Sequence, residues 1–158
     1  HSASSGDRML TVHASGGRLM LSAAMDGARR RRKETRMLVV AVKVLTSMDS
    51  SDLVEIGYSH SATDRVFRWA AMAKQSGVDG VVASPQEAAA IRQECGEDFL
   101  IVTPGVRPVW HGSDDQRRTL TPSEAVSAGA DVLVVGRPIT RADAPVEAAR
   151  RIMTEMNG

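Results

Sequence analysis

The sequence has little cysteine, no long apolar run and no leader of the secretory type. Its single cysteine, Cys95, cannot form a disulfide within the chain. The longest apolar run, Met37 to Val42, is far too short to cross a bilayer. The chain starts at His1 without an initiating methionine, and no charged and apolar leader follows. These features predict a cytoplasmic protein that does not interact with membranes.

Aromatic residues and excess charge of one sign are also scarce. Aromatic residues make up 3% of the 158 residues, and the formal net charge is +1. Stacking on bases requires aromatic rings, and strong binding to a phosphate backbone requires excess positive charge. The one dense basic run, residues 29–33, follows a helical stretch, so a solvated helix end is favoured over an anion-binding patch. Nucleic acid is therefore not an expected partner.

The sequence contains a repeated alternation of short apolar runs and longer stretches of helical period. With 42% hydrophobic residues, the chain can bury one core, and its strands lack polar alternation, as in a parallel sheet covered by helices. The expected strands are Met9 to His13, Met37 to Leu45, Gly80 to Ala83, Phe99 to Thr103 and Val132 to Val135. The expected helices are Gly17 to Arg32, Ser61 to Ser76, Pro85 to Cys95, Pro122 to Ala128 and Pro145 to Met156.

Turn and cap residues support the same α/β organisation. Residues 84–87 and 121–124 each place a hydroxyl residue before a proline and a glutamate, which is typical of a helix start. Residues 77–79 and 129–131 share the pattern Gly-x-Asp, in which the glycine ends a helix before a buried strand. Residues 5–7 look similar, so the chain is expected to begin within a unit. Five units fit either a doubly wound sheet or the last five of an eight-stranded barrel.

In both architectures, ligands bind at the carboxyl ends of the strands, and two of these segments combine glycine with arginine. Residues 103–108 and 135–138 contain Arg107 and Arg137, whose guanidinium groups match phosphate oxygens, while glycine lets the backbone approach an anion. The sequence therefore predicts a phosphate cradle, the alternative being turn glycines and surface arginines. The polar stretch from 109 to 120 has the length of a lid. Within it, Gln116 could reach a bound phosphate or base, and Trp110 could cap the pocket or lie on the surface.

Five segments, taken in order, resemble the bacterial orotidine 5′-phosphate decarboxylase family. Each segment alone is weak evidence, but the ordered set is specific and extends over nearly the whole chain. The segments are Thr11-Val12-His13-Ala14-Ser15-Gly16-Gly17, Val44-Leu45-Thr46-Ser47-Met48, Gly80-Val81-Val82-Ala83-Ser84-Pro85-Gln86-Glu87-Ala88, Val102-Thr103-Pro104-Gly105-Val106-Arg107-Pro108 and Val134-Val135-Gly136-Arg137-Pro138-Ile139-Thr140.

The resemblance implies a (β/α)8 TIM barrel and a lyase that converts orotidine 5′-phosphate to UMP and CO2 in pyrimidine biosynthesis. It implies no metal, no cofactor and a homodimer. Residues 1–158 would form a single domain, the C-terminal part of the barrel, and the first three strands are not in the sequence. By similarity, the substrate-binding residues would be Thr46 at the pyrimidine, Gln116 between base and phosphate, and Arg107, Gly136 and Arg137 at the phosphate. His13 and Ser15 would support the floor of the pocket.

The sequence departs from the family in its catalytic residues. The family's reactive centre is an array of the form D-x-K-x-x-D, and none of Lys33, Lys43 and Lys74 follows an aspartate by two positions. We therefore assign no catalytic residue to this chain. Lys43 could not substitute, because strand parity directs it toward the helices when Thr46 faces the barrel interior. There it would extend to solvent or pair with a helix carboxylate.

Two explanations of this departure stay open. Either the full protein has an N-terminal portion beyond this sequence, which we favour, or the chain is a truncated product that is inactive alone. Two other functions also stay open. One is a different phosphate-binding barrel enzyme, such as a sugar-phosphate decarboxylase or epimerase. The other is a non-catalytic nucleotide-binding partial barrel, which could assemble with itself.

Overall fold

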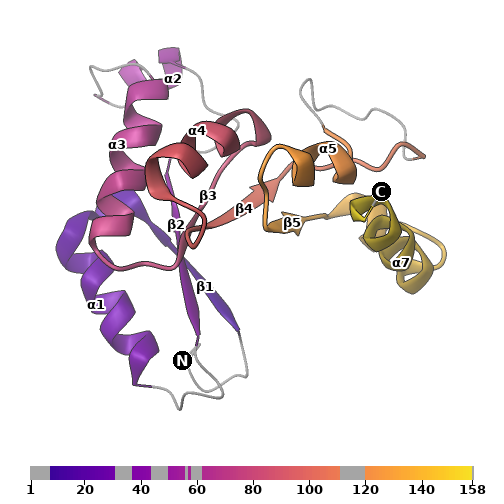
Figure 1. Cartoon of the computed structure of the whole chain (residues 1–158), viewed down its shortest axis with the longest axis horizontal. Coiled ribbons are helices and arrows are strands. Elements are labelled where there is room, and N and C mark those ends of the chain that lie inside the picture. Colours follow the sequence, from indigo (N-terminus) through magenta and orange to yellow (C-terminus); the bar gives the residue numbers. More distant parts are fainter. Residues whose placement is uncertain are drawn as a thin grey trace. The chain divides into compact units, whose positions relative to one another are not determined.

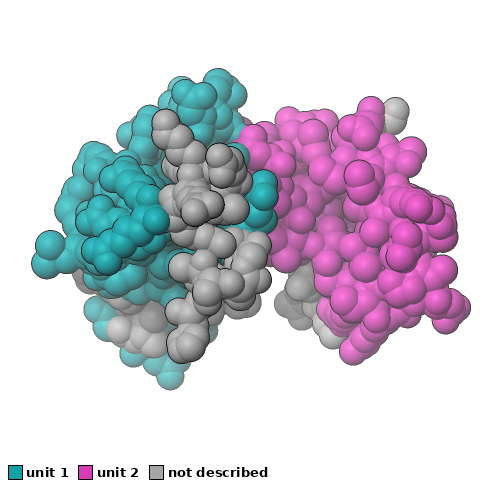
Figure 2. Space-filling view, turned by 90° about the horizontal axis from the view of Figure 1, so that it is seen from below, with its two compact units in different colours: residues 1–82, 90–100 teal, residues 83–89, 101–158 magenta. Residues whose placement is uncertain are grey.

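The computed structural model describes residues 8–30, 37–43, 50–55, 57, 62–110 and 120–157. It divides into two compact units, coloured separately in Figure 2. Unit 1 comprises residues 1–82 and 90–100, and unit 2 comprises residues 83–89 and 101–158. That residues 1–158 form a single domain stays a prediction.

Unit 1 contains three parallel strands in the order β1, β2, β3 (Figure 1). They are β1 (Met9–His13), β2 (Leu38–Val42) and β3 (Gly80–Val82). Helices α1 (Gly17–Arg29), α2 (Ser50–Glu55) and α3 (Ala62–Gln75) belong to this unit, as does the second half of α4 (Pro85–Cys95). The 3-10 turn η2 (Ala14–Gly16) connects β1 to α1.

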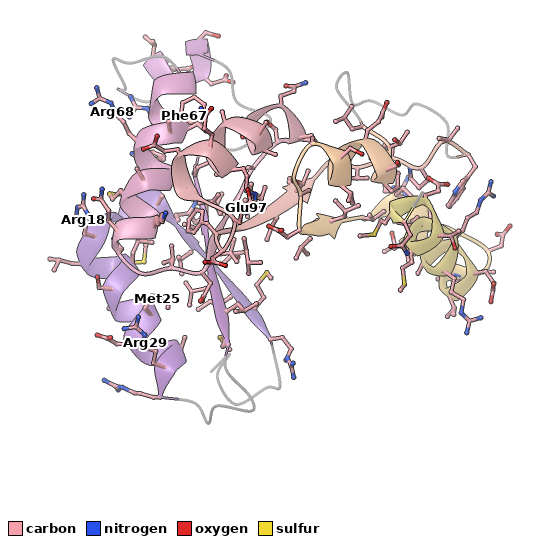
Figure 3. All side chains as sticks on the ribbon, viewed as in Figure 1. Arg18, Met25, Arg29, Phe67, Arg68 and Glu97 are labelled. Atoms are coloured by element: carbon pink, nitrogen blue, oxygen red, sulfur yellow. The ribbon has the colours of Figure 1, made fainter. Side chains whose placement is uncertain are left out.

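The core of unit 1 forms where the apolar faces of the helices meet the strands. Helix α1 buries Leu21 and Met25, and β2 buries Val39 and Val40. The opposite face of α1 is solvated, so Arg29 at its last turn is exposed whereas Met25 is in the core (Figure 3). This separation is what an apolar stripe of helical period produces.

Among the described residues, unit 2 contains two parallel strands, three whole helices and the first part of α4 (Figure 1). The strands are β4 (Leu100–Pro104), whose residues 101–104 belong to this unit, and β5 (Val132–Val134). The helices are α5 (Pro122–Ser127), α6 (Arg137–Thr140) and α7 (Pro145–Met156). Val106, Ala125 and Ala130 form its core with the partly buried Leu133 and Val135.

The structure confirms all five expected strands and all five expected helices, to within three residues at the described ends. The helices α2 and α6 were not expected. Both are short, and α6 starts at a Gly-Arg-Pro sequence that has the composition of a turn. In the part of the chain that is described, no helix is both long and apolar enough to span a membrane.

The two Gly-x-Asp segments form the same local structure. Gly129 has a φ of 104°, which glycine adopts readily, and it ends α5. The Asp131 carboxylate then accepts a hydrogen bond of 2.7 Å from the Ile101 N–H on the neighbouring strand. Asp79 accepts the Val39 N–H at 2.8 Å in the same way. Each aspartate thus ties the start of its own strand to the strand beside it.

The predicted helix caps differ in completeness. Thr121 and Glu124 form a full capping box at the start of α5. Hydrogen bonds from the Thr121 backbone N–H and hydroxyl lower the pKa of the Glu124 carboxyl. This contribution to stability is present above the normal carboxyl pKa and is lost as the pH falls through the lowered pKa. At α4, Glu87 accepts a hydrogen bond from the Ser84 N–H, whereas the Glu87 N–H bonds to the Ser84 carbonyl.

Of the two alternatives expected for Lys43, extension to solvent is wrong, because only 4% of its surface is exposed, and pairing with a helix carboxylate stays a prediction. Together with Lys74, Lys43 lies close enough to the Cys95 thiol of α4 to act on its charge. Burial raises the pKa of that thiol, and the two ammonium groups act in the opposite direction. This environment is consistent with a Lys43 side chain that points toward the helices.

Candidate functional site

Three of the five predicted substrate-binding residues are described, and all three belong to unit 2. Arg107 follows β4, whereas Gly136 and Arg137 follow β5. Thr46 and Gln116 lie outside the described residues. We call the segments 105–107 and 136–137 the cradle.

The two parts of the cradle leave the same edge of the sheet. Strands β4 and β5 are parallel, and Pro104 pairs with Val134 in their register. Adjacent strands lie about 4.8 Å apart, so the loops at their carboxyl ends begin as neighbours. The predicted meeting of the two Gly-Arg segments therefore has a structural basis in the pairing of β4 with β5.

The β4 part of the cradle buries a charged side chain. Gly105 has a φ of 76°, a conformation that other residues rarely adopt, and it turns the chain after the strand. Arg107 is then only 9% exposed, and its Nε has no hydrogen-bond partner among the described residues. A buried guanidinium N–H without an acceptor is costly, which favours an anionic ligand at this position.

The backbone beside Arg107 is held in place. Its N–H donates to the Leu120 carbonyl at 2.9 Å, and Val106 forms a parallel bridge with Leu120. These bonds join the segment just before the predicted lid, residues 109–120, to the last residue of that stretch. Of that stretch, residues 111–119 lie outside the described part, including His111.

The β5 part of the cradle is open. Gly136 caps α6, and its carbonyl accepts hydrogen bonds from the Ile139 and Thr140 N–H groups. A Cβ at Gly136 would meet nothing within 4 Å, so the space before this turn is free of described protein atoms. Arg137, the first residue of α6, is half-buried. An anion can therefore approach the backbone of Gly136, the residue directly before Arg137.

Sequence reasoning missed Thr103 as a candidate site residue. This side chain on β4 is fully buried, and its Oγ1 has no hydrogen-bond partner among the described residues. A threonine near the carboxyl end of a buried strand is the only signal that could have indicated it. Its hydroxyl can both donate and accept a hydrogen bond.

Trp110 lies at the end of the described segment after Arg107. Its ring is half-buried, and the guanidinium carbon of Arg151 on α7 lies 4.7 Å from the ring centroid. The ring thus packs against a helix of the same unit, and the alternatives of a pocket cap and a surface residue stay predictions.

Two hollows lie apart from the cradle. One of about 550 Å³ in unit 1 lies beside the starts of the strands and is lined by Lys74, Val78, Asp79, Cys95, Gly96, Glu97, Asp98, Phe99 and Leu100. The other, of about 360 Å³, lies between β5 and the helices α6 and α7. Neither is lined by Arg107 or Arg137, and their linings suggest no chemistry for the predicted reaction.

The remaining candidates belong to unit 1. His13 and Ser15, at and just after the end of β1, are both exposed. Lys74 is on α3, where its Nζ donates to the Cys95 carbonyl at 2.5 Å. Within the described ranges, no group of three or more histidine, cysteine or acidic side chains could hold a metal ion.

A family model described as the Orotidine 5′-phosphate decarboxylase / HUMPS family matches residues 1–152. A protein named orotidine 5′-phosphate decarboxylase from Heliobacterium modesticaldum is 54% identical over 155 residues, which are 96% of this chain and 64% of that protein. A second of the same name, from Chromohalobacter salexigens, is 53% identical over 148 residues, or 94% of this chain and 62% of its own length.

Solved structures give the same result. The crystal structure of orotidine 5′-phosphate decarboxylase from Lactobacillus acidophilus matches with a TM-score of 0.86 and 37% identity, over 99% of this chain and 66% of that one. A structure described as an uncharacterized conserved protein from Geobacillus kaustophilus matches with a TM-score of 0.78 and 38% identity, over 95% of this chain and 64% of its own. The chain thus spans a little under two thirds of these relatives, and the predicted barrel family is confirmed.

Proposed function

Because this chain belongs to the orotidine 5′-phosphate decarboxylase / HUMPS family, we propose that it carries the phosphate- and pyrimidine-binding part of an orotidine 5′-phosphate decarboxylase. The reaction converts orotidine 5′-phosphate to UMP and CO2. The observation that supports this most directly is the buried Arg107 Nε, which lacks an acceptor among the described residues. Arg107 follows β4, which pairs with β5, the strand before the open turn at Gly136.

The cradle would act on the phosphate, far from the reacting bond. Arg107 and Arg137 would donate hydrogen bonds to the phosphate oxygens, and the backbone at Gly136 would approach them without a side chain in the way. Thr46 would contact the pyrimidine and Gln116 would bridge base and phosphate. Binding energy from the phosphate can orient the ring and close a loop over it.

Decarboxylation requires groups that this sequence does not provide. Loss of CO2 leaves negative charge at C6 of the pyrimidine, and a positioned ammonium group would stabilise this charge and donate the proton. The array D-x-K-x-x-D, which would hold such a group, is absent from these 158 residues. We therefore propose that this chain contributes binding and orientation, and that the protein acts as a cytoplasmic homodimer without metal or cofactor.

A ligand comparison tests the proposal against other phosphate-binding barrel enzymes. Titration calorimetry of this chain with UMP and with ribose 5-phosphate is expected to give the tighter binding for UMP, by about tenfold, because the base adds polar contacts worth roughly 1 kcal/mol each. Uridine, which lacks the phosphate, is the matched control and should bind more weakly than UMP. Binding of ribose 5-phosphate without binding of UMP would contradict the proposal and favour a sugar-phosphate enzyme.

A further inference from the structure

The contact between Trp110 and Arg151 connects two parts of unit 2 that are distant in the sequence. Trp110 ends the segment that begins with Arg107, and Arg151 lies on α7. The guanidinium carbon is 4.7 Å from the ring centroid, well within the range of an attractive cation–π interaction. The ring is half-buried, so it lies against the unit and does not extend into solvent.

Helix α7 also packs against the other part of the cradle. Arg137 begins α6, and α6 contacts α7. Ile139 of α6 and Ile152 of α7 line the same hollow, and Ile152 is 4% exposed. Arg151 is therefore next to a residue that is fixed in the packing between α6 and α7.

The segment from Val106 to Trp110 is held at both ends. At its start, Val106 is in the core and the Arg107 N–H bonds to Leu120. Pro108 is fully buried, whereas Val109 is 80% exposed and therefore does not fix the segment in place. The stack of Trp110 on Arg151 is thus an attachment at the far end of this segment.

We infer that Arg151 is a positioning residue. Its stack on Trp110 holds the Arg107 segment against α7. This contact sets the spacing between the guanidinium groups of Arg107 and Arg137. This inference rests on the proposed function, because it assigns the spacing to phosphate binding. Two arginines recognise one phosphate only at a defined separation. The pairing of β4 with β5 fixes where the two segments start, and the contact through α7 connects the residues that follow those starts.

The test compares Arg151→Gln with Arg150→Gln. Arg150 is the matched control, because it lies on the same helix and, among the described side chains, pairs with the exposed Glu147 at 2.7 Å. We expect Arg151→Gln to weaken UMP binding by about two- to fivefold, the range of an exposed cation–π contact, and Arg150→Gln to leave it unchanged. Uridine binding should be the same in both variants, since uridine does not use the cradle. Arg151→Lys keeps a cation and Trp110→Phe keeps an aromatic ring, so each of these variants should bind UMP more tightly than Arg151→Gln does.

A second readout does not depend on the ligand. Hydrogen exchange of the Arg107 amide, measured by NMR in the free protein, should be faster in Arg151→Gln than in Arg150→Gln, because the segment is released at its far end. Equal exchange in the two variants, or UMP affinity that Arg151→Gln leaves unchanged, would overturn the inference. If the unmodified chain binds no UMP, the proposed function fails, and the exchange rates alone decide whether Arg151 positions this segment.

Discussion

Replacement of Arg137 by alanine is expected to weaken UMP binding by about ten- to a hundredfold. Hydrogen bonds to charged groups contribute roughly 1.5–3 kcal/mol, and Arg137 has a half-buried guanidinium beside the open turn at Gly136. The loss should be specific to the phosphate, because this side chain is assigned no contact with the base. Titration calorimetry with UMP and with uridine measures both quantities.

The matched control for this variant is Arg141→Ala. Arg141 lies at the other end of α6, is exposed, and carries the same charge. Its removal changes the net charge equally but should leave UMP binding within about twofold, since exposed charges several ångströms from a ligand are screened by salt. Equal affinity of Arg137→Ala and the unmodified chain would remove Arg137 from the site. An equal loss for the two variants would show that only overall charge matters.

Replacement of Gly80 by alanine is expected to produce the largest loss of stability. A Cβ at Gly80, the first residue of β3, would lie 2.3 Å from the Leu100 carbonyl oxygen and 2.6 Å from the Leu100 Cβ. The oxygen is a backbone atom and the Cβ is bonded directly to the backbone, so the strand itself would have to move. Forcing an extra carbon into a packed position costs about 1–3 kcal/mol, and more where backbone must shift. For a chain of this size, the melting temperature should fall by roughly 5 to 10 °C.

Gly27→Ala provides the control for that measurement. Gly27 lies in α1, is exposed, and has open space where its Cβ would be placed. Alanine is favoured over glycine in a helix by about 1 kcal/mol, so this variant should melt at the same temperature as the unmodified chain or at a higher one. A Gly80→Ala chain that is as stable as Gly27→Ala would show that β3 does not pack against Leu100 as described.

Local sequence patterns predicted the elements of this fold better than the contacts between them. The capping box at Thr121 and the glycine that ends α5 depend on residues within a few positions of one another, so the sequence alone indicates them. The role of Asp79 was not predicted, because its carboxylate accepts the N–H of Val39, which only strand pairing brings near. The same holds for the burial of Lys43, since the sequence does not show what packs over a strand.

The candidate site was predictable to the extent that parallel strands share an edge. The pairing of β4 with β5 explains why Arg107 and Arg137 leave the sheet as neighbours. The orphaned hydroxyl of Thr103 and the stack of Trp110 on Arg151 depend on tertiary packing, which no spacing in the sequence reveals. The assignments of Thr46 and Gln116 stay predictions, as both lie outside the described residues.

The central claim is that these 158 residues bind the nucleotide without performing the chemistry. The most direct test measures, on one preparation of this chain, the equilibrium binding of UMP and the release of CO2 from orotidine 5′-phosphate. We predict saturable UMP binding and no decarboxylation above the uncatalysed rate, because no D-x-K-x-x-D array is present to stabilise charge at C6. Enzymatic release of CO2, or a folded chain that binds no UMP, would contradict it.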